Sequence, residues 1–228
     1  MKEPKLIIAI DGPAGAGKST IAQRLARKLG YVNLETGAMY RALALKALQT
    51  ATPLEDELRL VDLAAQSHIE LEPTAAGNRV LLDSQDVSKR IREADVTDAA
   101  SRVSVHPRVR EWMVARQREM GAQGGVVMEG RDIGTHVFPN ADIKIFLDAD
   151  PVVRAERRIL QKGASPADAE ASKRTAEEIR QRDERDRTRA ASPLAPAPDA
   201  VVIDSSGLSI EEVIAHVEQV IEARLAHK

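Results

Sequence analysis

The chain has 228 residues, of which 43% are apolar and 30% are charged. This composition is typical of a folded globular protein, and the length suits one large domain or one domain with insertions. A balance of 33 Lys and Arg against 35 Asp and Glu argues against a dedicated nucleic-acid-binding protein. The sequence has no cysteine, which excludes disulfides, thiolate metal sites and cysteine nucleophiles. The early apolar run 6–10 is too short for a signal peptide or a membrane span, so we expect a cytoplasmic protein.

The first 50 residues alternate between patterns typical of strands and helices. A short apolar run leads into a glycine-rich loop, and apolar residues spaced by four then predict a helix that Gly30 ends. A second apolar run and a second helical pattern complete a unit that is typical of an α/β fold with a parallel sheet. In chain order, the expected elements are a strand at 5–10, a helix from Ser19, a strand at 31–34 and a helix from Thr36 to Leu48.

The middle of the chain departs from this rhythm. Two runs of alternating apolar residues, 68–72 and 79–83, flank Gly77 and Asn78. Such a pattern predicts an antiparallel hairpin, which does not belong in a parallel sheet. We therefore expect residues from about 60 to 105 to form an insertion.

The strand and helix rhythm returns after residue 105. Short apolar runs end in Glu129 and Asp148, and Ser209 with Glu212 forms the capping box of a last helix. A Lys-Gly-Ala-Ser-Pro segment at 162–166 breaks the helical pattern. The elements predict an α/β fold, with a five-stranded parallel sheet flanked by helices. Beyond those already named, they are helices at 54–67, 107–121, 150–160, 168–189 and from Ser209, and strands at 125–128, 142–147 and 200–203.

A glycine-rich motif follows the first expected strand and opens the first helix. Residues 12–19 match the pattern G-x-x-x-x-G-K-[ST], the phosphate-binding P-loop. Glycines let backbone N–H groups turn toward phosphate oxygens, and the helix that follows points its positive end at them. Lys18 would reach the β- and γ-phosphates, and the Ser19 hydroxyl would coordinate a Mg²⁺ held mostly by ATP phosphates and water. The residues predicted to bind ATP are Gly12, Pro13, Ala14, Gly15, Ala16, Gly17, Lys18, Ser19 and Thr20.

Arginines help to separate kinases from other P-loop proteins. The chain has 23 Arg but only 10 Lys, and a guanidinium group matches phosphate oxygens better than a point charge does. A GTPase switch would need an Asn-Lys-x-Asp motif, which the sequence lacks. A kinase that acts on a metabolite needs a second binding site, a lid and arginines around the transferred group. Three segments carry such arginines: 36–41, 130–132 and the charged stretch 154–189.

The residue types alone leave several functions open. The arginines at 36–41 and 130–132 follow strand ends, where open α/β sheets bind ligands, whereas those at 154–189 also fit a solvated helix face. Another small-molecule P-loop kinase, acting on UMP, AMP or a non-nucleotide metabolite, fits the motifs. A nucleotide-gated binding module would also fit, and would hydrolyse ATP slowly without an acceptor. RNA binding by the arginine-rich segment 180–189 is disfavoured by its interleaved acidic residues.

Six segments together resemble the bacterial cytidylate kinase family over about residues 5 to 225. Many families share the P-loop, whereas the Gly-Arg-Asp and Arg-Asp-x-Arg-Asp-Arg segments are more specific. The resemblance implies a P-loop core with a nucleoside-monophosphate-binding insertion and a short lid. The implied bounds are 1–59, 106–153 and 190–228 for the core, about 60–105 for the insertion and about 154–189 for the lid region, of which 154–162 would move. The six segments are 12–20, 36–41, 129–135, 138–139, 144–149 and 182–187.

The resemblance also implies how the chain binds the phosphate and sugar of CMP. Arg41, Arg131 and Arg189 stand where the family holds the phosphate. Arg182 and Asp186 stand where it contacts the sugar. These assignments rest on the resemblance alone.

By the same resemblance, Ser101, Arg110 and Asp132 read cytosine. Cytosine presents an amine donor beside ring acceptors, and a carboxylate with a guanidinium complements that pattern. Tyr40 stands at a further position that binds CMP in the family, and Thr36 stands where some members have Ser.

The implied reaction transfers the γ-phosphoryl group of ATP to CMP, and also to dCMP, with Mg²⁺. The attacking phosphate is already largely ionised at pH 7, so the reaction needs no general base. Catalysis then consists of aligning two anions and neutralising charge on the transferred group. That work falls to four cations, Lys18, Arg131, Arg154 and Arg158. We expect a monomer that has no nucleic-acid or membrane partner.

Overall fold

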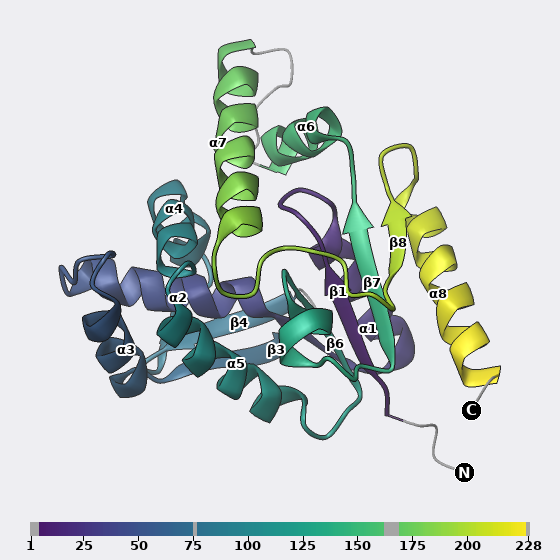
Figure 1. Ribbon diagram of the computed structural model, residues 1–228, viewed down its shortest axis with the longest axis horizontal. Helices are drawn as coiled ribbons and strands as arrows, with labels where there is room; N and C mark the ends of the chain where they lie inside the picture. The colour runs from purple at the N-terminus through teal and green to yellow at the C-terminus, as the bar shows by residue number, and fades with distance from the viewer. Residues whose placement is uncertain (1–4, 75–76, 162–168, 227–228) are drawn as a thin grey trace.

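Five parallel strands form the central sheet, and their order confirms the α/β fold that the sequence predicts. The structure is a computed structural model that describes residues 5–74, 77–161 and 169–226 (Figure 1). From one edge of the sheet to the other, the strands are β2 (Val32–Glu35), β6 (Val126–Gly130), β1 (Ile7–Asp11), β7 (Ile143–Asp148) and β8 (Val201–Asp204). Because β1 is the middle strand, the loop that follows it opens at the centre of the sheet's carboxyl edge.

Seven helices lie where the sequence patterns predict them, within a few residues at each end. No described helix is both long enough and apolar enough to cross a membrane. The helices are α1 (Lys18–Leu29), α2 (Thr36–Gln49), α3 (Glu57–Gln66), α5 (Pro107–Gly121), α6 (Pro151–Gln161), α7 (Ala169–Thr188) and α8 (Ile210–Ala226). The predicted break at 162–166 lies outside the described residues.

The sequence analysis does not predict three helical segments, η1 (Arg90–Arg92), α4 (Ala94–Val103) and η2 (Ile133–Val137). η1 and η2 are too short to produce a periodic pattern. The buried stripe of α4 contains alanines, which give only a weak apolar signal. The position of η2 matters for function, because this π-helical turn directly follows the Gly-Arg-Asp segment.

The two faces of the sheet carry separate hydrophobic cores. Ile8 and Ile10 of β1 face the core formed with α1 and α8, whereas Ala9 faces the core formed with α2, α5 and the insertion. This alternation follows from the period of two in a strand. Buried on both faces, the sheet holds its carboxyl edge, and the loops on it, in a fixed position.

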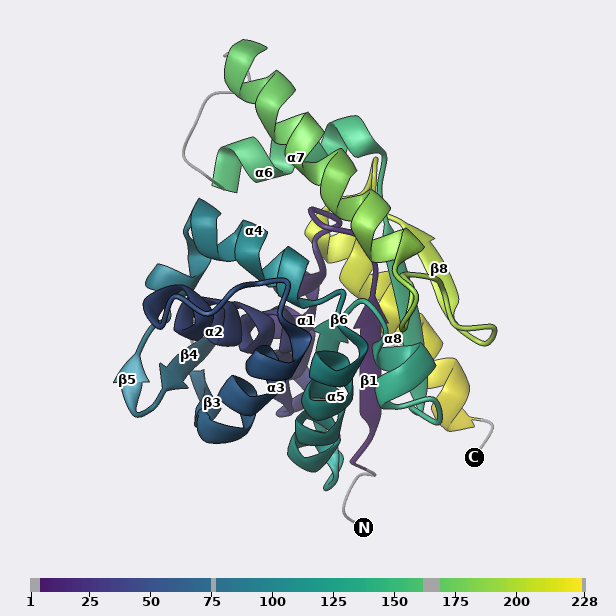
Figure 2. The same ribbon diagram turned by 60° about the vertical axis from the view of Figure 1, so that its left-hand side comes forward.

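The hairpin predicted around Gly77 and Asn78 is present. β3 (Ile69–Thr74) and β4 (Gly77–Leu82) pair antiparallel, and the short β5 (Gln85–Asp86) extends them into a separate three-stranded sheet. In Figure 2 this small sheet lies beside α2, far from the β8 edge of the central sheet. α4 packs against α2 and carries Ser101 toward the predicted site. The division of the chain into core, insertion and lid stays a prediction.

α6 and α7 stand beyond the carboxyl ends of β1 and β7 (Figure 1). The two helices pack on each other, and α7 also touches α4 through an ion pair of 3.2 Å between Arg185 and Asp98. The arginines of the charged stretch are therefore brought over the same sheet edge as the P-loop. The sequence predicted the helix but left open whether its arginines face solvent.

The capping box of α8 provides a test of the fold. The Ser209 Oγ accepts the Glu212 N–H at 3.2 Å, and the Glu212 carboxylate accepts the Ser209 N–H at 2.8 Å. We expect Ser209→Ala to lower the free energy of unfolding by about 1 kcal/mol in urea denaturation followed by circular dichroism. Ser209→Thr keeps the hydroxyl and is the matched control, with a loss below about 0.5 kcal/mol. Equal stability of Ser209→Ala and wild type would contradict this role of the cap.

Candidate active site

The P-loop joins β1 to α1, and its glycines adopt backbone conformations that other residues avoid. Gly12 has φ +148°, and an added Cβ would lie 1.9 Å from the carbonyl oxygen of Leu147 in β7. Gly17 has φ +95° and precedes the first turn of α1. These glycines let the loop turn against the sheet, so the unpaired N–H groups at the start of α1 are available to an anion.

Lys18 lies inside the loop, where its ammonium group donates to the carbonyl oxygen of Pro13 at 2.7 Å. Burial, followed by the nearby positive charge of Arg131, lowers the pKa of Lys18 to about 7. A buried lysine with a lowered pKa contributes little as the cation of a structural ion pair. It is instead suited to an incoming polyphosphate, whose charge would restore the ammonium form.

Glu129, at the end of β6, faces the P-loop from the neighbouring strand. The Ser19 hydroxyl donates to its carboxylate at 2.6 Å, and burial together with the nearby Glu35 raises the pKa of Glu129. A hydroxyl and a carboxylate beside a triphosphate loop are the oxygen ligands that Mg²⁺ prefers, so these residues fit that ion. Glu129 belongs to the segment 129–135 of the family resemblance, but the sequence analysis does not predict it as a site residue. Its position at the end of an expected strand, where parallel sheets bind ligands, is the feature from which it could have been predicted.

On the acceptor side, α5 and the segment after β6 meet in a buried ion pair. The Arg110 guanidinium binds the Asp132 carboxylate at 2.5 Å and donates to the Ser104 carbonyl at 3.2 Å. Both side chains are less than 10% exposed, and Arg110 lies over the Tyr40 ring at 5.5 Å. The Ser101 hydroxyl is buried and has no hydrogen-bond partner among the described residues. Of the residues predicted to read cytosine, the structure joins Arg110 and Asp132 and leaves the buried Ser101 hydroxyl without a partner in the described part of the chain.

Arg131 connects this cluster to α7. Its Nε donates to the Asp186 carboxylate of α7 at 2.8 Å. On the same helix, the Nε of Arg182 is buried and unpartnered within the described structure. Burial lowers the pKa of Arg182 to about 10, with the charge of Arg131 as the next cause. Two crowded guanidinium groups, one of them without a carboxylate partner, are suited to a bound anion.

Arg189 lies close to two carboxylates of the predicted CMP site, Asp132 and Asp186. Its guanidinium is 3.9 Å from Asp132 and 3.7 Å from Asp186, and its Nε donates to the Ser192 carbonyl at 2.7 Å. Burial lowers the pKa of Arg189, and Arg110 is the charged group that contributes most to this shift. Arg131 also binds the Asp186 carboxylate, at 2.8 Å, so Asp186 lies between Arg189 and Arg131, two of the three residues that the resemblance assigns to the CMP phosphate.

Arg41 is held by a carboxylate that the sequence analysis missed. Glu35, the residue before α2, forms an ion pair with Arg41 and a second one, of 3.4 Å, with Arg92 of η1. Burial opposes ionisation of Glu35, but the two arginines outweigh it and lower the pKa of its carboxyl group. Arg41 is therefore held in place while no phosphate is bound.

The two predicted lid arginines differ in environment. Arg154 is 3% exposed, and its guanidinium donates to the carbonyls of Ala149 and Ala14 and to Asp183 at 2.5 Å. It braces α6 against the P-loop. Arg158 is half-buried, and burial followed by the charge of Arg41 lowers its pKa. The nearby Glu178 offsets part of the effect of Arg41 on Arg158.

Two further predicted residues lie within the site. The Thr36 hydroxyl donates to the Glu129 carbonyl at 2.8 Å, so its proton is already used inside the protein. Thr20 lies in the first turn of α1, behind Ser19. The structure thus brings the predicted ATP residues and CMP residues to one edge of the sheet.

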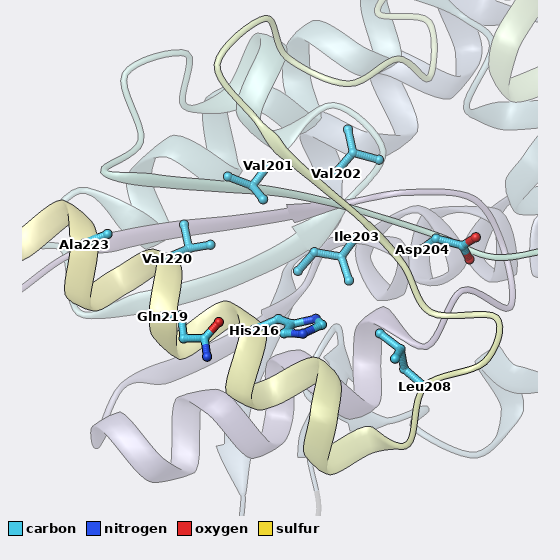
Figure 3. A pocket seen from close by; sticks show the side chains of 9 residues that line it. All are labelled: Val201, Val202, Ile203, Asp204, Leu208, His216, Gln219, Val220 and Ala223. Atoms are coloured by element: carbon cyan, nitrogen blue, oxygen red, sulfur yellow. The ribbon is translucent and has the colours of Figure 1, made fainter.

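A shallow cavity of about 480 Å³ lies elsewhere, between β8 and α8. Figure 3 shows Val201, Val202 and Ile203 lining one side, and His216 and Val220 of α8 lining the other. None of the predicted site residues lines it. Its apolar lining and position at an edge strand give it no part in phosphate chemistry.

Known proteins match the chain along almost its whole length. The sequence model of the family described as cytidylate kinase matches residues 8–223. A cytidylate kinase of Geobacillus kaustophilus is 50% identical over 223 residues, which are 97% of this chain and 98% of that protein. A cytidylate kinase of Pasteurella multocida is 44% identical over 221 residues, 97% of either chain.

Among solved structures, an uncharacterised protein from Eubacterium ventriosum has a TM-score of 0.54 and 12% identity, and the match covers 95% of this chain and 98% of that one. At that identity the likeness concerns the fold alone. The family match and the sequence identities go further: this chain belongs to the cytidylate kinase family.

Proposed function

We propose that this chain transfers the γ-phosphoryl group of ATP to CMP, and also to dCMP, giving ADP and the diphosphate. One observation carries the proposal: a P-loop lysine and a buried arginine–carboxylate pair lie at the same sheet edge. Gly130 ends β6, directly beside the P-loop strand β1, and Arg131 and Asp132 follow it. The family membership supports the same reaction.

Asp132 and Arg110 would distinguish cytosine from uracil. A carboxylate accepts from the exocyclic amine of cytosine, and a guanidinium donates to the ring acceptors. Uracil presents a carbonyl where cytosine has the amine, so UMP would place an oxygen against the Asp132 carboxylate. Because that carboxylate is buried, water cannot relieve the repulsion, and the discrimination against UMP should be strong.

The phosphates would be held by cations that converge from several elements. Lys18 of the P-loop and Arg131 after β6 would neutralise the transferred group, with Arg158 reaching it from α6. Arg182 would join them, since its guanidinium is crowded by Arg131 and lacks a carboxylate partner among the described residues. Arg189 would join Arg131 at the CMP phosphate, since the Asp186 carboxylate lies 2.8 Å from Arg131 and 3.7 Å from Arg189. Ordering two anions in line and neutralising their charge is the main catalytic task in phosphoryl transfer.

Mg²⁺ would be held by the ATP phosphates, with Ser19 as protein ligand and Glu129 accepting through water. When bound, the ion supplies positive charge that offsets the charge on the transferred phosphoryl group. Arg154 acts in this proposal as a brace between α6 and the P-loop rather than as a contact to phosphate. The core, insertion and lid bounds, the cytoplasmic location and the monomeric state stay predictions.

The reaction is tested by ADP release with Mg-ATP and one acceptor at a time: CMP, dCMP, UMP, AMP or GMP. We expect CMP and dCMP to give the highest kcat/KM. Phosphorylation of AMP or UMP above CMP would replace the proposed acceptor with another one. ATP binding without turnover of any acceptor would remove the kinase assignment but leave the P-loop.

Asp132→Ala tests the base reader. Loss of the carboxylate leaves the cytosine amine and the Arg110 guanidinium without their partner, so we expect kcat/KM for CMP to fall by about 100-fold or more. The dissociation constant for ATP should change less than about threefold. Glu119→Ala removes an exposed carboxylate from α5 and is the control, with unchanged kinetics. Equal loss of CMP turnover and ATP binding would contradict base reading by Asp132.

The pKa of Lys18 predicts a pH dependence of ATP binding. In the free protein its pKa is about 7, so the amine is largely neutral above that pH, and binding to polyphosphate requires it to take up a proton. Calorimetry should therefore show the dissociation constant for Mg-ATP rising between pH 7.5 and 9, by up to about tenfold per unit. Lys18→Arg keeps its charge and should show a flat profile, however weak its binding. A flat wild-type profile would contradict the lowered pKa.

A further inference from the structure

The carboxylate of Asp11 makes two hydrogen bonds that lie outside the reaction described above. Asp11 is the last residue of β1 and is 5% exposed. Its Oδ1 accepts the Ile133 N–H at 2.8 Å, and its Oδ2 accepts the Gly134 N–H at 2.7 Å. These two donors open the π-helical turn η2, where backbone N–H groups have no partner within the turn.

The register of the sheet places this carboxylate under η2. Asp11 pairs with Gly130 of β6 on one side and with Phe146 of β7 on the other. Its side chain lies on the same face as that of Ala9, because residues two apart in a strand point the same way. That face packs against η2, so the middle strand of the sheet supports the turn from below.

The residues around η2 pack closely against it. A Cβ added to Gly134 would lie 3.4 Å from the Asp11 Oδ2 and 3.2 Å from the Cδ of Lys144. The Lys144 ammonium donates to the Pro139 carbonyl at 2.5 Å and to Asp199 at 2.8 Å. η2 is therefore fixed at its start by Asp11 and just beyond its end by Lys144.

The residue before the two bound N–H groups is Asp132. Its backbone, with φ −147° and ψ 26°, leads into η2, and its carboxylate meets Arg110 at 2.5 Å. A fixed start of η2 leaves the Asp132 Cα little freedom. Asp11 is also bonded through the chain to Gly12, so one residue ties the base reader to the P-loop.

We propose that Asp11 is a positioning residue, which holds Asp132 where it distinguishes CMP from UMP and sets the distance between the two substrate sites. This inference rests on the proposed function. Asp11 itself touches neither substrate; it acts through the backbone of Ile133 and Gly134.

The two backbone hydrogen bonds explain why a carboxylate stands at position 11. Burial raises the pKa of Asp11 to about 6, and the two backbone hydrogen bonds oppose that rise. Asparagine would fill the same space but could accept only one of the two N–H groups. Its own NH₂ group would face the other, donor against donor.

Asp11→Asn tests the proposal through the ratio of kcat/KM for CMP to that for UMP. We expect kcat/KM for CMP to fall by about 10- to 100-fold, because a displacement of about 1 Å in a binding residue has effects of this size. Since UMP makes no productive contact with Asp132, the ratio should fall by about tenfold or more. The dissociation constant for Mg-ATP, measured without acceptor, should change less than about threefold, because the P-loop glycines are unaltered.

Val217→Ala is the matched control for lost stability. Val217 is fully buried in α8, on the face of the sheet opposite to η2, so its truncation should lower the Tm without moving the CMP to UMP ratio. An Asp11→Asn enzyme with a lower Tm and an unchanged ratio would overturn the positioning role. Wild-type enzyme that fails to phosphorylate CMP would instead overturn the proposed function.

Gly134→Ala perturbs the same hydrogen bonds from the other partner, and serves if Asp11→Asn does not fold. Its Cβ would push η2 away from Asp11 and Lys144 by a few tenths of an ångström while both charges remain. We expect the same signature, a lower CMP to UMP ratio with ATP affinity retained. Soluble Gly134→Ala with the wild-type ratio would overturn the inference.

Discussion

Buried positive charge is the constraint on which the rest of this site depends. The cations near the P-loop lower each other's pKa values, as the shifts of Lys18 and Arg182 indicate. Carboxylates offset part of this repulsion in three short ion pairs, Arg110–Asp132, Arg131–Asp186 and Arg154–Asp183, at 2.5, 2.8 and 2.5 Å. Breaking a buried pair by removing one partner typically costs about 3–5 kcal/mol, so each carboxylate fixes its arginine firmly.

The same ion pairs connect parts of the chain that are far apart in sequence. Two of the three carboxylates, Asp183 and Asp186, come from α7, which therefore attaches both to the P-loop side and to the acceptor side. An incoming phosphate would bring negative charge to Lys18 and Arg182, whose positive charges the protein balances only in part. Substrate binding and the arrangement of α7 are thus linked through electrostatics, which is how an enzyme of this kind brings two anions together.

Much of the fold and part of the site could be predicted from residue patterns. The apolar run of β1, the period of 3.6 in α1 and the glycines between them predicted the P-loop correctly, because each depends on local sequence. The residues that hold the functional groups were missed. Glu35, Asp183 and Asp11 bind partners that lie 6, 29 and at least 122 positions away in the chain, and no periodic pattern or motif links the two members of such a pair.

The sequence by itself determined the α/β fold class, the P-loop, the antiparallel hairpin and the family resemblance, since these rest on short-range periodicity and on motifs with fixed spacing. Only the tertiary structure decided which arginines are paired and which are left for phosphate. It also decided that Arg154 serves the P-loop and that Asp11 supports the turn after Asp132. The reason is physical: a guanidinium or carboxylate acquires its role from burial and from the charges around it, and both depend on how distant segments pack.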